Sequence, residues 1–115
     1  MAKIRVVMCP VDRAPYVTWI EDSLENLQRT VGGYIEYFTF AKDAVIVCNE
    51  EGRMMGLSEN KSLLLSGFRG DCFICGVDGE NFVSLGDEQR KTLLHWCKKR
   101  WEKAQRGLKG ESTEM

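Results

Sequence analysis

The sequence predicts an α+β domain, in which a single mixed or mostly antiparallel sheet of four to six strands carries one short helix and one long C-terminal helix packed on it. Three observations support this prediction. Short apolar segments of strand-like composition recur between residues 3 and 83. One interval between them, residues 22–33, shows helical spacing instead, and a long amphipathic stretch follows residue 86.

The chain length fits one domain. Its 115 residues can enclose a core without metal or disulfide staples, and 43% hydrophobic with 29% charged residues is ordinary for a globular protein. We therefore expect one domain over residues 1–109, which includes a C-terminal helix at about 86–107, and a disordered tail at 110–115.

Two strands are predicted at the N-terminus. In KIRVVM, residues 3–8, apolar side chains alternate with Lys3 and Arg5, the pattern of a strand buried on one face. The following CPVDRAP has a proline near each end and is typical of a turn. YVTWI, residues 16–20, is rich in β-branched and aromatic residues, so we expect the chain to return there as a second strand.

A short helix is expected next. Apolar residues recur at helical spacing, at Leu24, Leu27 and Val31. Asp22 or Ser23 can cap its start by accepting a hydrogen bond from a free backbone N–H group. The glycine pair 32–33 then ends it, because glycine takes the left-handed cap conformation without a steric clash. A phosphate-binding glycine loop would precede a helix, so this pair indicates a cap and not a ligand site.

Further strands are predicted in the middle of the chain. YIEYFTF (34–40) and AVIVCN (44–49) form a hairpin, and CFICGV (72–77) is another buried strand. After an Asp-Gly turn, NFVSL continues as a short strand or an extended segment that leads into the last helix. Apolar residues on both faces of 44–49 indicate a central strand. Residues 53–71 have no clean period and predict a loop, with one short helix near 61–65.

The C-terminal helix is the clearest element. Its apolar positions are spaced alternately three and four residues apart: Leu94, Cys97, Trp101, Ala104 and Leu108, with Leu93 and Trp96 widening the seam. Six turns span about 30 Å, whereas strands of five or six residues span less than about 20 Å. We therefore expect the second half of the helix to extend beyond the sheet, where its apolar stripe would need a partner.

Charge is concentrated in the same helix. From Arg90 to Lys109 there are eight basic residues and one acidic residue, in a chain of net charge −1. The predicted partner-binding residues are Trp96, Lys98, Lys99, Arg100, Trp101, Lys103 and Arg106. Their basic side chains could attract nucleic acid through its phosphates, with tryptophan stacking on bases, or they could form only the solvated side of an amphipathic helix.

The cysteines and the histidine do not suggest catalysis. Cys72 and Cys75 have C-x-x-C spacing, but they lie in a strand-like run, where residues three apart point to opposite faces and cannot share a zinc ion. His95, the only histidine, has no identifiable carboxylate partner. We therefore predict no catalytic residue, no metal site and no cofactor, and reduced, buried thiols.

The long loop offers a second type of site. Because functional residues are often found in long loops, we predict ligand-binding residues at Arg53, Asn60, Lys61 and Arg69, suited to a small anion such as a nucleotide signal. The N-terminal apolar stretch of about six residues is too short for a signal sequence or a membrane span, which favours a cytoplasmic protein without a membrane partner.

The sequence also resembles a known family. LQRTVGGYIE (27–36), VIVCNEEGRMMGL (45–57) and GVDGENFVSLGDEQ (76–89) are similar to members of DUF3846, a family of small proteins with a domain of unknown function found in bacteria, archaea, phages and mobile elements. The similarity spans residues 3 to about 95. It implies an α+β domain and a mobile-element setting, and it supplies no catalytic residue.

Together these observations suggest a binding protein and not an enzyme. The leading hypothesis is a phage or mobile-element protein that modulates or inhibits a host defence factor by protein contact. The first alternative is sequestration of a small anionic ligand, and the second is nucleic-acid binding through the C-terminal helix. A homodimer formed through that helix is a further option.

Overall fold

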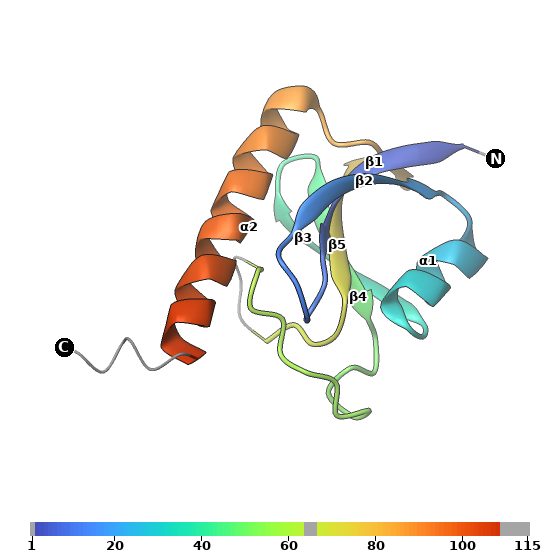
Figure 1. Ribbon diagram of the computed structural model, residues 1–115. Helices are drawn as coiled ribbons and strands as arrows, with labels where there is room; N and C mark the ends of the chain where they lie inside the picture. The colour runs from blue at the N-terminus through green and yellow to red at the C-terminus, as the bar shows by residue number, and fades with distance from the viewer. Residues whose placement is uncertain (1, 64–66, 109–115) are drawn as a thin grey trace.

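The computed structural model describes residues 2–63 and 67–108. It has one six-stranded sheet, a short helix and a long C-terminal helix, which confirms the α+β prediction (Figure 1). The strands are β1 (Lys3–Cys9), β2 (Tyr16–Glu21), β3 (Ile35–Ala41), β4 (Ala44–Asn49), β5 (Cys72–Asp78) and β6 (Asn81–Val83). The tail predicted at 110–115 lies outside the described residues.

All strand pairs are antiparallel, and their order is β2-β1-β5-β4-β3, with β6 paired to β5. The predicted strands therefore all form, within one or two residues of the expected bounds. β4 is buried along its whole length, which confirms its central position. The sequence left open a mixed or a mostly antiparallel sheet, and the structure has an antiparallel one.

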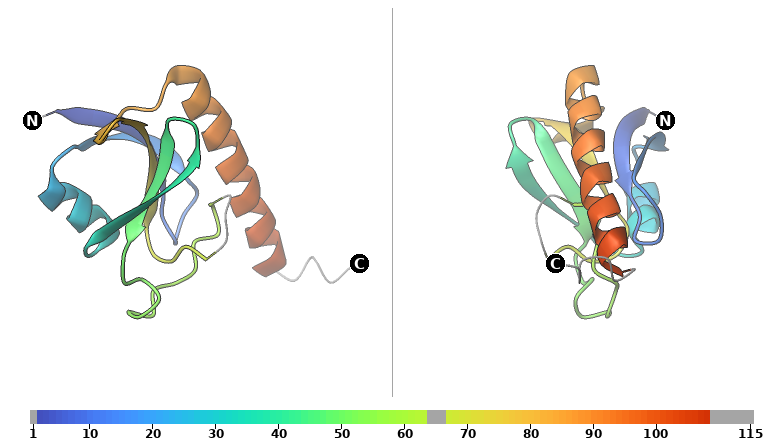
Figure 2. Two further views of the ribbon diagram at one scale, coloured as in Figure 1. Left: turned by 180° about the vertical axis from the view of Figure 1, so that it is seen from behind. Right: turned by 60° about the vertical axis from the view of Figure 1, so that its left-hand side comes forward.

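The core has two halves because the sheet is covered on both faces, by α2 (Asp87–Leu108) on one and α1 (Leu24–Val31) on the other (Figures 1 and 2). The α2-side half contains Val7, Cys9, Ile46, Ile74, Leu93 and Cys97 among others. The α1-side half contains Val6, Leu27, Val31, Val47, Phe73 and Cys75 among others. Alternation along β5 places Cys72 in the first half and Cys75 in the second, as expected of strand residues three apart.

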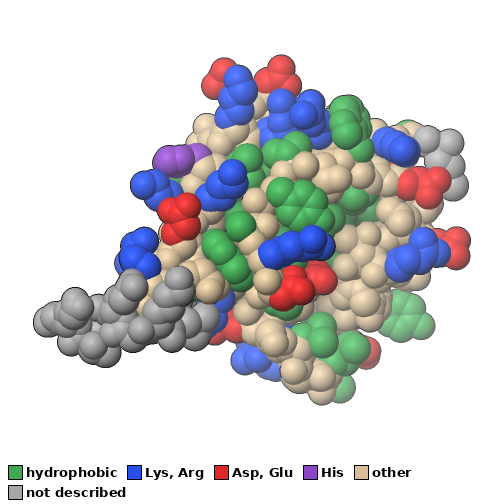
Figure 3. Space-filling view, viewed as in Figure 1, with side chains coloured by type: hydrophobic (Ala, Val, Ile, Leu, Met, Phe, Trp, Pro, Cys, Tyr) green, Lys and Arg blue, Asp and Glu red, His purple; other side chains and the backbone are tan. Residues whose placement is uncertain are grey.

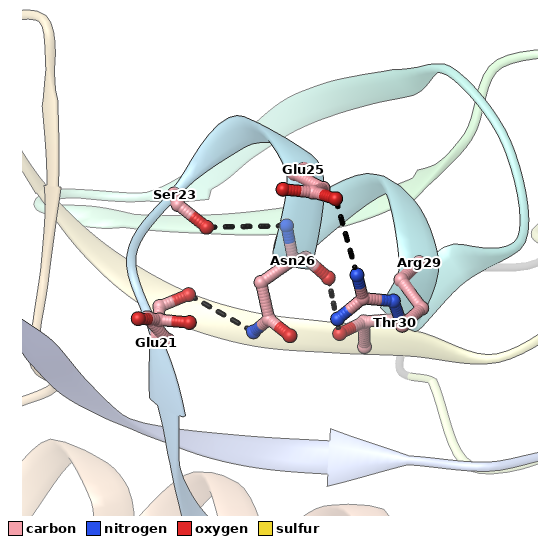
Figure 4. A network of polar contacts seen from close by, with 6 residues as sticks. All are labelled: Glu21, Ser23, Glu25, Asn26, Arg29 and Thr30. Carbon is pink, nitrogen blue, oxygen red and sulfur yellow. Dashed lines mark hydrogen bonds and ion pairs between the residues drawn. The ribbon is translucent and has the colours of Figure 1, made fainter. Parts of the chain in front are cut away.

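Both ends of α1 are capped as the sequence indicates, and Figure 4 shows the contacts at its N-terminal end. Of the two predicted N-caps it is Ser23 that serves, since its hydroxyl accepts a hydrogen bond from the backbone N–H of Asn26 at 3.2 Å. The Asn26 side chain donates in turn to the carbonyl of Glu21. At the other end Gly32 adopts a left-handed φ of 81° and donates its N–H to Gln28 O, so the glycine pair ends a helix as predicted.

The C-terminal helix forms as predicted, but one detail of its packing is wrong. It runs from Asp87 to Leu108, one residue later at each end than the expected 86–107. Leu93 and Cys97 are buried, whereas Trp96 is 53% exposed and does not widen the apolar seam. The reason is geometric: at 100° per residue Trp96 lies on the flank of the helix, about a quarter-turn from the line through Leu93 and Cys97.

The second half of α2 is less exposed to solvent than the sequence predicted. Its C-terminal end reaches beyond the sheet, as Figure 2 shows, but Trp101 and Ala104 are half-buried. Arg100 Nε donates a hydrogen bond to the carbonyl oxygen of Leu63, so the loop after β4 lies beside this part of the helix. Of the helix expected near 61–65, residues 61–63 form a bend instead, and 64–65 are outside the described residues.

Candidate functional site

The residues predicted to bind a partner are distributed around α2 and do not form one patch. Trp96, Lys99 and Lys103 lie three and four residues apart and therefore share one side of the helix, which we call the Trp96 flank. Gln89 lies two turns before Trp96 on the same side of α2, and it donates a hydrogen bond to the carbonyl of Lys42. Lys42 connects β3 to β4, so the Trp96 flank faces the β3 edge of the sheet.

The other members of the predicted set have different surroundings. Lys98 is exposed on the opposite side of the helix from the Trp96 flank, and Trp101 is half-buried. Arg100 is held by its hydrogen bond to Leu63, and Arg106 is exposed near the end of the helix. Only part of the set is therefore free to contact a partner on one side.

The half of α2 that carries the Trp96 flank is strongly basic. Between Trp96 and Arg106 there are five basic residues and one acidic residue, a net charge of 5 − 1 = +4. Ion pairs within the described part of the chain involve Arg13, Arg29, Lys61 and Arg90, and none of these five cations. Figure 3 shows basic side chains beside the histidine along the outer side of α2. An acidic surface could therefore approach without breaking internal pairs.

The predicted ligand-binding set is divided by the structure. Arg53 and Arg69 line the same cavity of about 460 Å³, between the β3–β4 hairpin and the loop after β4. Asn60 and Lys61 do not contribute to it. Asn60 is 5% exposed and donates to the carbonyls of Cys9 and Gly70 at 2.7 and 2.8 Å, so it anchors the loop. Lys61 instead pairs with Glu59 at 3.1 Å.

Several residues of this cavity were not anticipated from the sequence. Phe38 of β3 and Phe68 of the loop meet edge to face, with ring centroids 5.4 Å apart. Glu36 and Glu50 also line the space. The aromatic composition of YIEYFTF could have indicated this aromatic surface. Its apolar residues fall on both faces, so some of its rings stay exposed when the strand forms the edge of a sheet.

The five cysteines are all free thiols and all buried. Burial raises the pKa of Cys48 to about 11, with Glu36 adding to the effect, and that of Cys75 to about 12. Burial likewise raises the pKa of Cys72 well above its usual range. Cys97 differs, because the hydrogen bond from the Cys9 thiol lowers its pKa. Most of these thiols are therefore poor nucleophiles.

This burial predicts slow thiol chemistry in the folded protein. A thiol of pKa about 12 is ionised in only about one molecule in ten thousand at pH 8, and access is blocked as well. Iodoacetamide at pH 8 should therefore modify Cys72 and Cys75 only after guanidinium unfolds the chain, when all five cysteines react. Site-resolved mass spectrometry measures this. Rapid labelling of either residue in the native protein would contradict the prediction.

Metal binding has no geometric basis in the part of the chain that is described. Among these residues, no three His, Cys, Asp or Glu side chains come together in a way that could hold an ion. His95 is exposed on α2. Within the same residues, neither helix combines the length and the apolar character that a membrane crossing requires.

Comparison with known proteins identifies a family. The family model described as "Domain of unknown function (DUF3846)" matches residues 4–98, which include the sheet except Lys3, α1 and the first half of α2. No curated protein and no solved structure matches the chain. Because the match covers most of the sequence, the chain belongs to the DUF3846 family.

Proposed function

We propose that this protein is a non-enzymatic binding protein that contacts an acidic surface of another protein through the Trp96 flank of α2. The observation that carries the proposal is the placement of Trp96. It is 53% exposed, on the same side of α2 as Lys99 and Lys103, about a quarter-turn from Leu93 and Cys97, which pack on the sheet.

Physical reasons favour a protein partner at this position. Tryptophan is among the residues that contribute most to protein interfaces, because its large ring excludes water from the contact. A rigid helix presents that ring without any backbone segment having to be ordered on binding. Lys99 and Lys103 beside the ring, supported by the other cations of this half of α2, would accelerate the approach of an acidic surface and repel a basic one.

The same charge argues against a second copy of this chain as the partner. Two such flanks facing each other would bring like charges together, which is destabilising. In the mobile-element setting that the sequence resemblance suggests, the partner would be a host factor in the cytoplasm, such as a defence component, and contact would modulate or inhibit it. Nucleic acid is the remaining alternative for a basic helix.

The test compares two tryptophans of equal exposure. Trp96→Ala should abolish enrichment of one acidic protein from host lysate. Trp19→Ala, at a residue 54% exposed on β2, should leave it intact. With the purified partner, Trp96→Ala should weaken binding by about 2 kcal/mol or more, measured by calorimetry, and Lys99→Glu with Lys103→Glu should slow association.

Three results would refute the proposal. Equal loss of binding in the Trp96→Ala and Trp19→Ala variants would show that the partner does not bind specifically at the Trp96 flank. Loss of the captured protein after nuclease treatment would show that nucleic acid is the ligand. A concentration-dependent dimer in analytical ultracentrifugation that Trp96→Ala dissolves would identify a second copy as the occupant.

A further inference from the structure

The cavity beside β3 is an open groove with the size of a small-molecule site. Its volume of about 460 Å³ lies within the range of pockets that hold such ligands. Cys48 and Phe38 contribute from the hairpin, while Gly52–Arg53 and Gly67–Arg69 contribute from the loop. Because α2 contacts β1 and β2, it leaves this end of the same sheet face uncovered.

Two arginines of the loop line this space. Arg69 is half-buried and donates through Nη1 to the carbonyl of Leu57 at 3.1 Å, which fixes its position and leaves its other donors available. The Arg53 side chain reaches toward the same segment, since its Nη2 lies 3.9 Å from where a Cβ on Gly67 would be. Neither takes part in an ion pair with another described residue.

The opposite side of the cavity offers aromatic surface. Phe38 is 42% exposed, and its ring meets Phe68 at an interplanar angle of 74°. In an edge-to-face pair at least one ring face stays free to stack on a planar group. The carboxylates of Glu36 and Glu50, which also line the space, can accept hydrogen bonds from ring amino groups or hydroxyls.

We infer that this cavity binds a small organic anion that carries a flat ring, the chemistry of a nucleoside phosphate. The two arginines bind the anionic group as bidentate donors. Phe38 stacks on the ring, and the two glutamates accept hydrogen bonds from its polar edge. This site shares no residue with the Trp96 flank.

Calorimetry with the full chain tests the inference. The probes are the four nucleoside monophosphates, with ribose 5-phosphate and inorganic phosphate as ligands that lack the ring. At least one nucleotide should bind, and Arg53→Gln should weaken it about 10- to 100-fold, because a charge-assisted hydrogen bond is lost. Arg53 is exposed, so this variant should keep the fold. Arg106→Gln removes the same charge from α2 and should leave the affinity unchanged.

The role of the ring is tested separately. Phe38→Leu keeps apolar volume but removes the aromatic face, so nucleotide affinity should fall while phosphate affinity does not change. The inference is overturned if none of the four nucleotides binds, or if Arg106→Gln weakens binding as much as Arg53→Gln. It is also overturned if ribose 5-phosphate binds as tightly as the best nucleotide.

Discussion

Replacing Phe73 by alanine is expected to remove about 3–5 kcal/mol from the free energy of unfolding. The ring is fully buried in β5, opposite Met8 of β1 and Val47 of β4, so its loss leaves a cavity where three strands meet. A small domain has only about 5–15 kcal/mol of stability in total. The variant should therefore lose a large fraction of its stability and unfold at a much lower urea concentration than the wild type.

Urea unfolding followed by circular dichroism measures this effect. Tyr34→Ala is the control, because that aromatic ring is 65% exposed and its removal should cost less than about 0.5 kcal/mol. A Phe73→Ala protein that unfolds within about 1 kcal/mol of the wild type would show that the centre of the sheet can collapse around the missing ring.

Replacing Asn60 by leucine is expected to cost about 3 kcal/mol, although Asn60 is a loop residue. Its amide donates to the carbonyls of Cys9 and Gly70, and its Oδ1 accepts from the backbone N–H of Ser62 at 3.1 Å. Leucine of similar size leaves these three buried backbone groups without partners, and each unsatisfied group costs about 1–3 kcal/mol.

The Asn60→Leu substitution should destabilise the loop more than the rest of the domain. Hydrogen exchange should accelerate around residues 58–70 under conditions in which β4 and β5 stay protected. Asn81→Leu, at an exposed asparagine of β6, serves as the matched control and should change neither stability nor exchange there. An Asn60→Leu protein with unchanged loop protection would rule out the anchoring role of this amide.

Local periodicity was enough to predict the elements of this fold. Alternation and β-branched composition located the strands, and the Ser23 and Gly32 caps defined α1, because these signals depend on residues close in sequence. Periodicity could not say which side of the apolar stripe on α2 faces the sheet. That choice depends on contacts with distant strands, so Trp96 was assigned to the seam although it is exposed.

The candidate site shows the same limit. Arg53 and Arg69 were predicted as ligand residues, but their meeting in one cavity depends on how the loop folds back, including the bridge between Glu59 and Arg69. Asn60 was predicted as a ligand residue because it is polar and lies in a loop. Its burial follows from the carbonyl of Cys9, 51 residues away, which no local pattern encodes.

The strand order has a consequence for how the chain folds. The hairpins β1–β2 and β3–β4 pair residues that are close in sequence, whereas β5 is made later and lies between β1 and β4. Until Cys72–Asp78 emerges during synthesis, the two ribbons share no sheet, and an isolated hairpin is only marginally stable in water. The domain therefore gains its stability late, and a chain interrupted before residue 72 would present open strand edges to its neighbours and tend to aggregate.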